Sequence, residues 1–170
     1  MRKLVTILAV LLLSGTGLFF FTKKDDKTSA SPSPSSLIVS ENKNVDIKAG
    51  FAIFTNGTYR IFSDKKYHNL SQEVYIESQN PNIVVVKNAE TTWGDFFKTL
   101  PMKLEKDCLT TGTGQLFCTG ESGELKFYIN NTQNQDALTK KISNGDKLLV
   151  TFGSKESNLK YELSQIPDPN

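Results

Sequence analysis

The sequence predicts an α+β fold in which an antiparallel or mixed β-sheet carries one main helix. Runs rich in β-branched and aromatic residues alternate with turn-forming residues over residues 46–166, and such runs predict strands. A clear helical period appears at about residues 92–100, in the middle of these runs. Strands do not alternate regularly with helices, as they do in parallel α/β sheets, so the α+β class is favoured.

Two hairpins are expected before the helix. Residues 51–54 and 59–62 are apolar runs on either side of Asn56-Gly57, a pair that favours the two-residue type I′ turn. Residues 74–76 and 83–86 are two further apolar runs, joined by a segment rich in Ser, Asn and Pro that predicts a turn. Each pair of runs is therefore expected to form antiparallel strands.

The main helix is predicted by its apolar face. The residues of this face recur at intervals of three and four: Trp93, Phe96, Phe97 and Leu100. A threonine at position 91 or 92 can cap the helix, Asp95 suits the positive end of the helix dipole, and Pro101 ends the helix. We interpret the aromatic side chains of this face as core rather than as an exposed recognition patch.

After the helix, the sequence predicts four more strands and a short second helix. The strands are expected at residues 104–109, 115–119, 125–129 and 148–152, and the helix at residues 158–166. A hairpin, a helix laid across it and then further strands is the order of a β-grasp domain. The hairpin at residues 51–62 would be an N-terminal addition to that domain.

The first 27 residues predict a signal anchor. Residues 4–21 contain no charged side chain, and their length is near the short end of the roughly 17–25 residues that a spanning helix needs. Arg2 and Lys3 precede this segment, which favours a single-pass arrangement with the C-terminal part outside the cytoplasm. A cleaved signal peptide is the alternative interpretation.

The domain boundaries follow from composition. Residues 28–45 are expected to be a Ser/Pro-rich linker, because residues 28–36 contain only Thr, Ser, Ala and Pro and have too little apolar surface to offset the entropy of ordering. An extracytoplasmic α+β domain is expected at residues 46–166, followed by a tail at residues 167–170. The protein is thus predicted to reside in the cell membrane with this domain displayed outside.

Composition argues against several function classes. Residues 1–27 carry five Lys or Arg and two Asp, a net charge of +3, which leaves −1 on the rest of a chain whose total is +2; this argues against a nucleic-acid-binding surface. One histidine and two cysteines are too few for a multi-histidine metal centre, a four-cysteine zinc site or an iron–sulfur cluster. The histidine, His68, lies in a polar stretch, and no Gly-x-Ser-x-Gly motif accompanies it. We therefore expect no metal, no cofactor and no catalytic residue.

Cys108 and Cys118 predict a disulfide. The nine residues that separate them favour a hairpin connection, and such a pair oxidises outside the cytoplasm. Closing so short a loop constrains the unfolded chain by about 2–3 kcal/mol. A redox pair is the alternative, but redox centres typically use a Cys-x-x-Cys spacing.

An enzymatic alternative would use two carboxylates, as glycosidases do. The acidic candidates are Glu73, Glu77, Asp95, Glu105, Asp107, Glu121 and Glu124. Each lies where a solvated strand edge or a turn is expected, so we assign none of them to catalysis. Asp146, which follows Asn144-Gly145, is expected to serve a turn.

Several segments together resemble a known group of proteins. They are residues 51–57, 92–97, the pair Cys108 and Cys118, and residues 125–130, 145–150 and 163–168. In this order they resemble an uncharacterised group of membrane-anchored, extracytoplasmic proteins of archaea and candidate-phylum bacteria. The later part of the chain is also similar to the C-terminal β-grasp domain of transcobalamin-like proteins. Members of the first group often carry histidines on the hairpin before the helix, whereas residues 74–77 and 83–87 of this chain have none.

The sequence therefore predicts a membrane-anchored extracytoplasmic module that binds a ligand or a protein of the cell envelope. The strands at residues 51–54 and 148–152 are candidate sheet edges that could pair with a partner. The alternative function is that of a cell-envelope hydrolase using a carboxylate pair. The site residues assigned from the sequence are the disulfide cysteines Cys108 and Cys118.

Overall fold

The computed structural model describes residues 44–154 and 158–169, which form a mixed α+β domain. The strands are β1 (Asn44–Thr55), β2 (Thr58–Arg60), β3 (Val74–Ile76), β4 (Ile83–Asn88), β5 (Lys103–Leu104), β6 (Cys108–Thr110), β7 (Leu116–Cys118), β8 (Glu124–Ile129), β9 (Thr132–Gln133) and β10 (Lys147–Gly153). The helices are α1 (Trp93–Thr99) and α2 (Leu159–Ser164), with single 3-10 turns η1 (Lys65–Tyr67) and η2 (Ala137–Thr139). The predicted fold class is thus confirmed.

The predicted N-terminal segments lie almost entirely outside the described residues. These are the membrane helix at residues 4–21, its charged flank up to residue 27, and the linker up to residue 43. Within residues 44–154 and 158–169, no helix has the length and apolar character that a membrane span requires. The first described strand begins at Asn44, two residues before the predicted start of the domain.

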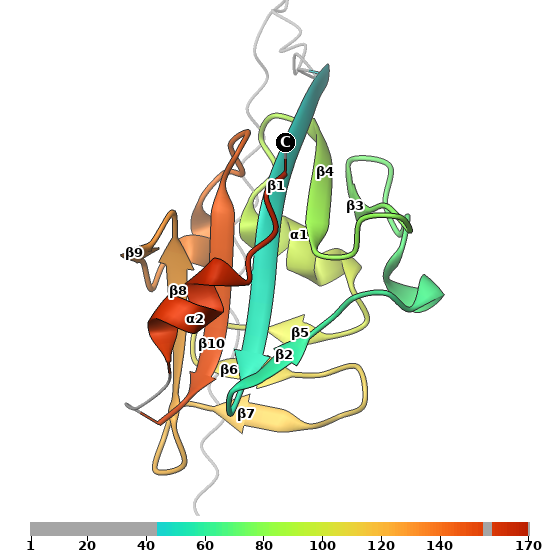
Figure 1. The fold of residues 1–170 in the computed structure, drawn as a ribbon. Helices are drawn as coiled ribbons and strands as arrows, with labels where there is room; N and C mark the ends of the chain where they lie inside the picture. The colour runs from blue at the N-terminus through green and yellow to red at the C-terminus, as the bar shows by residue number, and fades with distance from the viewer. Residues whose placement is uncertain (1–43, 155–157, 170) are drawn as a thin grey trace, which may run out of the picture. The chain divides into compact units, whose positions relative to one another are not determined.

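The main sheet is mixed and has the strand order β3-β4-β1-β10-β8-β9, with β2 beside the end of β1. The central pair, β1 and β10, is parallel, and the other neighbours are antiparallel. Helix α1 follows β4, and the chain then passes through β5, β6 and β7 before it reaches β8 on the other side of this centre (Figure 1). In the order expected for a β-grasp-like domain, an antiparallel pair of strands is followed by a helix and then by a last strand parallel to the first. Here β1 and β4 are the antiparallel pair, α1 is the helix and β10 is the last strand.

The first hairpin is present, and its first strand is also the centre of the sheet. Asn56 and Gly57 have φ values of 50° and 73°, as the type I′ turn requires at both central positions. Strand β1 extends back to Asn44, where its first half pairs with β4, while its last residues pair with β2. The hairpin therefore belongs to the core sheet and is not a separate addition.

The prediction that residues 51–54 and 148–152 form free sheet edges is wrong. Strand β1 has neighbours on both sides, and β10 lies between β1 and β8. Every residue of β1 from Ala49 to Thr55 is buried, as are the five central residues of β10. Such continuous apolar runs are typical of strands that are covered on both faces.

A small second sheet replaces the single strand predicted at residues 104–109. Its order is β5-β6-β7, and β5 pairs with β6 through Leu104 and Leu109. The charged residues 105–107 between them are exposed and form the connection. Strand β6 then pairs with β7, with Cys108 opposite Cys118.

The two faces of the main sheet are covered by different elements. Phe51 and Ile53 point to the face that α1 and the small sheet cover, where they join the larger core cluster. Ala52 and Phe54 point to the opposite face, where the cluster includes Ile166 after α2. In Figure 1, α2 lies in front of the sheet and α1 behind it. The alternation along β1 thus divides the domain into two cores.

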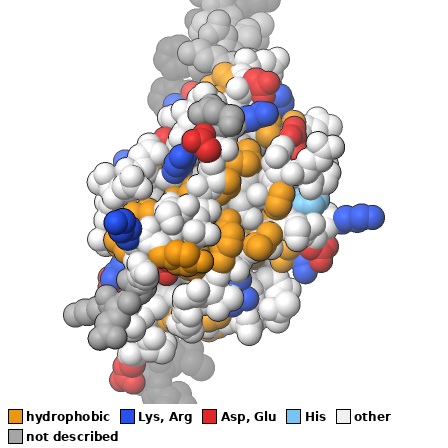
Figure 2. Space-filling view, in the orientation of Figure 1, with side chains coloured by type: hydrophobic (Ala, Val, Ile, Leu, Met, Phe, Trp, Pro, Cys, Tyr) orange, Lys and Arg blue, Asp and Glu red, His pale blue; other side chains and the backbone are white. Residues whose placement is uncertain are grey.

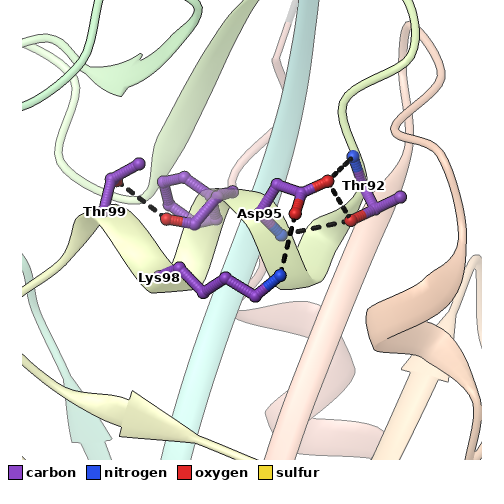
Figure 3. Close-up of polar contacts among 5 residues, drawn as sticks. Thr92, Asp95, Lys98 and Thr99 are labelled. Carbon is purple, nitrogen blue, oxygen red and sulfur yellow. Dashed lines mark hydrogen bonds and ion pairs between the residues drawn. The ribbon is translucent and has the colours of Figure 1, made fainter.

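Helix α1 begins with a capping box. Asp95 N–H donates to Thr92 Oγ1 at 3.1 Å, and Thr92 N–H donates to Asp95 Oδ2 at 3.2 Å. The Lys98 ammonium group lies 3.0 Å from Asp95 Oδ1, and Thr99 Oγ1 donates to the Phe96 carbonyl oxygen (Figure 3). The hydrogen bond from Thr92 and then the contact with Lys98 hold the pKa of Asp95 below its ordinary value of 3.8.

Asp95→Asn is expected to lower the stability at neutral pH and to flatten the acid limb of the stability curve. Because the pKa of Asp95 is lower in the folded state, its carboxylate stabilises the fold above pH 3.8, and this contribution is lost as the pH falls through the folded-state value. Urea unfolding over a range of pH measures the difference, with Asp107→Asn as the control. A deficit of Asp95→Asn that stays constant at acid pH contradicts this role for the charge.

The C-terminal segment, predicted as a tail at residues 167–170, packs against the sheet over its described part. A Cβ atom on Gly50 would overlap the carbonyl oxygen of Pro167, so the segment approaches the β1 backbone closely. Asp168 pairs with Lys147 at 3.2 Å, and Pro169 is buried. The second helix, predicted at residues 158–166, is confirmed as α2 and leads into this segment.

Candidate binding pocket

A pocket of about 290 Å³ opens where the main sheet meets the small sheet. Its walls come from residues 59–62 at the end of β2, from Tyr67 in η1, from Met102 after α1, and from β6 with the loop that follows it. We call it the Arg60 pocket, because Arg60 is the one charged residue in its wall. Segments far apart in the sequence therefore build it.

Apolar and aromatic side chains form most of the Arg60 pocket. Ile53 and Leu109 are buried at its base, each with 1% exposure. The rings of Phe62 and Tyr67 pack edge to face with centroids 4.9 Å apart. Ile61 is the exposed one among the apolar side chains of this lining, at 59%. Such a lining, with few polar groups, is typical of small-molecule sites.

The guanidinium group of Arg60 is held in a fixed orientation. Its Nε–H donates to Thr55 Oγ1 at 2.8 Å, and its Cζ lies 5.7 Å from the ring centroid of Phe117, within the range of a cation–π contact. No acidic side chain of the described domain forms an ion pair with it. A half-buried cation thus faces the pocket without a carboxylate partner.

Asn82 holds the strand that carries Arg60. Its side chain is 2% exposed, with Oδ1 accepting from Phe62 N–H at 3.3 Å and Nδ2 donating to the Arg60 carbonyl oxygen at 3.3 Å. Its own carbonyl oxygen accepts from Phe51 N–H. Sequence reasoning placed residue 82 only in a turn. The sequence signal that could have drawn attention to it is an Asn between a proline and an apolar run, since Asn tolerates the positive φ that residue 82 adopts.

The β6–β7 connection closes the other side of the pocket. The predicted disulfide Cys108–Cys118 is present and ties the two strands together. Thr111 Oγ1 and Thr113 Oγ1 are hydrogen-bonded to each other at 3.0 Å. Between them, Gly112 passes so close to the Pro101 carbonyl oxygen that a Cβ atom would lie 2.7 Å from it. The disulfide and this close approach set the position of the wall.

A further polar side chain, that of His68, supports the segment between β2 and η1. His68 Nε2–H donates to the Phe62 carbonyl oxygen at 2.8 Å, so the chain's histidine has a structural contact. Burial raises the pKa of the Tyr59 phenol above its ordinary value of 10.0, so this residue stays a neutral donor. Within the described ranges, no group of three or more His, Cys, Asp or Glu side chains could hold a metal ion.

The acidic candidates lie outside the Arg60 pocket. Glu105 pairs with Lys103, and Asp95 caps α1. Asp146 is 9% exposed and accepts from Asn130 Nδ2 and Ser143 N–H, as the predicted turn requires. The structure therefore gives three of these carboxyl groups local structural roles.

Glu121 and Glu124 do share a hollow, of about 230 Å³, at the turn before β8. Both side chains are exposed, and Glu124 pairs with Lys126 at 3.1 Å. A wider hollow beside α2 is lined by Leu163 and Ile166. Neither place combines aromatic walls with an oriented cation, as the Arg60 pocket does.

Comparisons of the chain with protein-family models, with curated proteins and with solved structures found no match. The resemblance to membrane-anchored extracytoplasmic proteins stays a prediction.

Proposed function

We propose that the chain is a membrane-anchored extracytoplasmic binding module whose ligand site is the Arg60 pocket. The observation that carries the proposal is the presence of an oriented cation without an acidic partner in an apolar pocket. The volume of about 290 Å³ is at the lower end of the range for small-molecule sites. A small ligand suits this site better than a protein segment.

The N-terminal sequence and the disulfide support the location. Residues 4–21 are uncharged and follow Arg2 and Lys3, as in a helix that crosses the membrane with its N-terminus inside. The disulfide Cys108–Cys118 is a bond that persists in oxidising compartments. Both features agree with a domain displayed outside the cytoplasm, where it meets extracellular or envelope ligands.

Protein interaction through the same domain is the broader form of this proposal. Hydrophobic side chains gather over the middle of the face shown in Figure 2, and charged side chains lie mostly around its edge. Ile61 and Leu116 are two large aliphatic residues exposed by more than half, at 59% and 65%. Ile61 lines the Arg60 pocket whereas Leu116 does not, so substitutions at these two positions separate ligand capture from contact with an envelope protein.

A carboxylate-pair hydrolase has weaker support. Glu121 and Glu124 line a common hollow, but a glycosidase acid is kept protonated by apolar surroundings, and both of these side chains are exposed. Glu124 also pairs with Lys126, as is common for carboxylates at a protein surface. The binding module is therefore the function that the geometry supports best.

The test uses the full chain, reconstituted in lipid nanodiscs, with phenylacetate and phenylacetamide as probes. We expect at least one probe to shift the methyl NMR signals of Ile53 and Leu109 in a saturable way. Ile61→Ser, at the mouth of the pocket, is expected to weaken this binding about three- to tenfold, because an apolar contact of roughly 1 kcal/mol is lost. Leu116→Ser is the matched control and is expected to leave it unchanged.

Three results would contradict the proposal. Failure of the chain to insert into nanodiscs would contradict the proposed membrane anchor. Absence of binding by both probes would contradict the proposal that the pocket binds small aromatic ligands. Equal weakening by Ile61→Ser and Leu116→Ser would indicate a general loss of apolar surface rather than a specific site.

A further inference from the structure

We infer that the Arg60 pocket binds a small molecule with an apolar body and a single carboxylate, and that the Arg60 guanidinium group hydrogen-bonds this carboxylate. The inference rests on the proposed function and specifies its ligand class. It follows from how the guanidinium group is held, from the charges in the pocket wall and from the shape of the lining.

The orientation of Arg60 suits a carboxylate. In the sheet register, Arg60 lies directly opposite Ile53, so both side chains are on the face of the sheet that meets the small sheet. The Nε–H group of Arg60 donates a hydrogen bond to the Thr55 hydroxyl, and the Phe117 ring packs against the guanidinium group. These contacts leave the two Nη groups, which have no hydrogen-bond partner in the described domain. Free, coplanar Nη–H donors in a fixed orientation match the two oxygens of a carboxylate.

The charges in the pocket wall suit a monoanion. Arg60 is the one charged residue among those that line the pocket. The nearby Lys66 is paired with Asp64 at 3.6 Å and lies over the Tyr67 ring, and it does not line the pocket. One cation in apolar surroundings balances a monoanion, whereas a dianion would bring in an uncompensated charge. The site therefore favours a carboxylate over a phosphate monoester.

The rest of the pocket wall suits an apolar ligand body. Phe62, Tyr67, Met102 and Leu109 offer apolar and aromatic surface to the body of the ligand. Gly112 and Thr113 line the same pocket, and their backbone N–H groups make no hydrogen bond within the described ranges. A ligand with an apolar body and a carboxylate needs apolar surface around its body and hydrogen-bond donors near its oxygen atoms, and this wall offers both.

The experiment compares phenylacetate with phenylacetamide on the full chain in nanodiscs, since the two probes share their shape and differ in charge. Phenyl phosphate is the third probe. The variants are Arg60→Gln, which removes the cation, Arg60→Lys, which keeps the charge without the planar donors, and Thr55→Val, which frees Nε from its acceptor. Lys66→Gln is the matched control, because it removes a neighbouring cation that does not line the pocket.

We expect phenylacetate to bind at least about tenfold more tightly than phenylacetamide, because hydrogen bonds to a charged group in a desolvated site are strong. Phenyl phosphate should bind more weakly than phenylacetate. Arg60→Gln should reduce phenylacetate affinity about 10- to 100-fold and leave phenylacetamide affinity within about twofold. Arg60→Lys and Thr55→Val should each cause a smaller, several-fold loss for phenylacetate alone. Lys66→Gln should change neither.

Three patterns overturn the inference while leaving the binding module standing. The first is equal affinity of the wild-type chain for phenylacetate and phenylacetamide. The second is a loss of phenylacetate affinity in Lys66→Gln as large as in Arg60→Gln, which would show general electrostatic attraction. The third is tighter binding of phenyl phosphate, which overturns the assignment to carboxylates. Absence of binding by all three probes overturns the proposed function together with the inference.

Discussion

Phe51→Ala is expected to destabilise the fold by about 3–5 kcal/mol, the usual cost of removing a buried aromatic ring and leaving a cavity. Phe51 has no exposed surface. Its ring centroid lies 5.1 Å from those of Phe62 and Phe96 and 5.9 Å from that of Phe97. The ring therefore joins β1 to helix α1 and to the segment that forms the pocket wall. A loss of this size is a large part of the 5–15 kcal/mol by which domains are typically stable.

Urea unfolding of the full chain measures this loss. Tyr161→Ala is the matched control, since Tyr161 is 51% exposed and its removal opens no cavity; a change within about 1 kcal/mol is expected there. If Phe51→Ala lowers the free energy of unfolding no more than Tyr161→Ala does, the placement of Phe51 at the centre of the core is wrong.

Asn82→Ala is expected to destabilise the fold by about 2–4 kcal/mol and to weaken phenylacetate binding at the Arg60 pocket. The substitution removes the acceptor of Phe62 N–H and the donor to the Arg60 carbonyl oxygen, and it leaves a buried N–H unpaired. It also places alanine at a φ of 72°, which costs about 1–2 kcal/mol for a residue with a Cβ. Affinity falls as well because the backbone of residues 60–62 loses its support.

Two companion variants separate the causes. Asn82→Gly tolerates the positive φ but lacks both side-chain hydrogen bonds, so its loss in urea unfolding measures those bonds. Asn82→Asp keeps an acceptor for Phe62 N–H and lacks the donor to Arg60. Wild-type stability and phenylacetate affinity in Asn82→Gly would show that the side chain does not hold the pocket wall.

Local sequence signals identified those parts of the fold that neighbouring residues decide. The Asn56-Gly57 turn was predictable because only a few residue types adopt positive φ at two successive positions. The core face of α1 was predictable from its period, and of the two predicted capping threonines the structure uses Thr92, in a capping box with Asp95 that was not predicted. A second pair of residues at positive φ, Asn130-Asn131, forms the turn from β8 to β9. Strand β9 was missed because a strand of two residues has no recognisable period.

The candidate site was hardly predictable, except for Cys108 and Cys118. Arg60, Asn82 and Gly112 bear no motif, and their importance arises from contacts with segments distant in the sequence. Asn82 reaches Phe62 across 20 positions, and Gly112 meets Pro101 through the fold of the small sheet. No local period or spacing encodes such contacts.

The sequence by itself determined the α+β class, the main helix, the turns and the cysteine pair, because local backbone preferences and the burial of apolar side chains dictate these features. Tertiary structure alone decided that β1 and β10 lie side by side as the central parallel pair and that Arg60 faces an apolar pocket without a carboxylate. The physical reason is that strand pairing and pocket formation depend on which distant segments meet, and many pairings satisfy the same local pattern of apolar and polar residues. Only the packing of both sheet faces selects one of them.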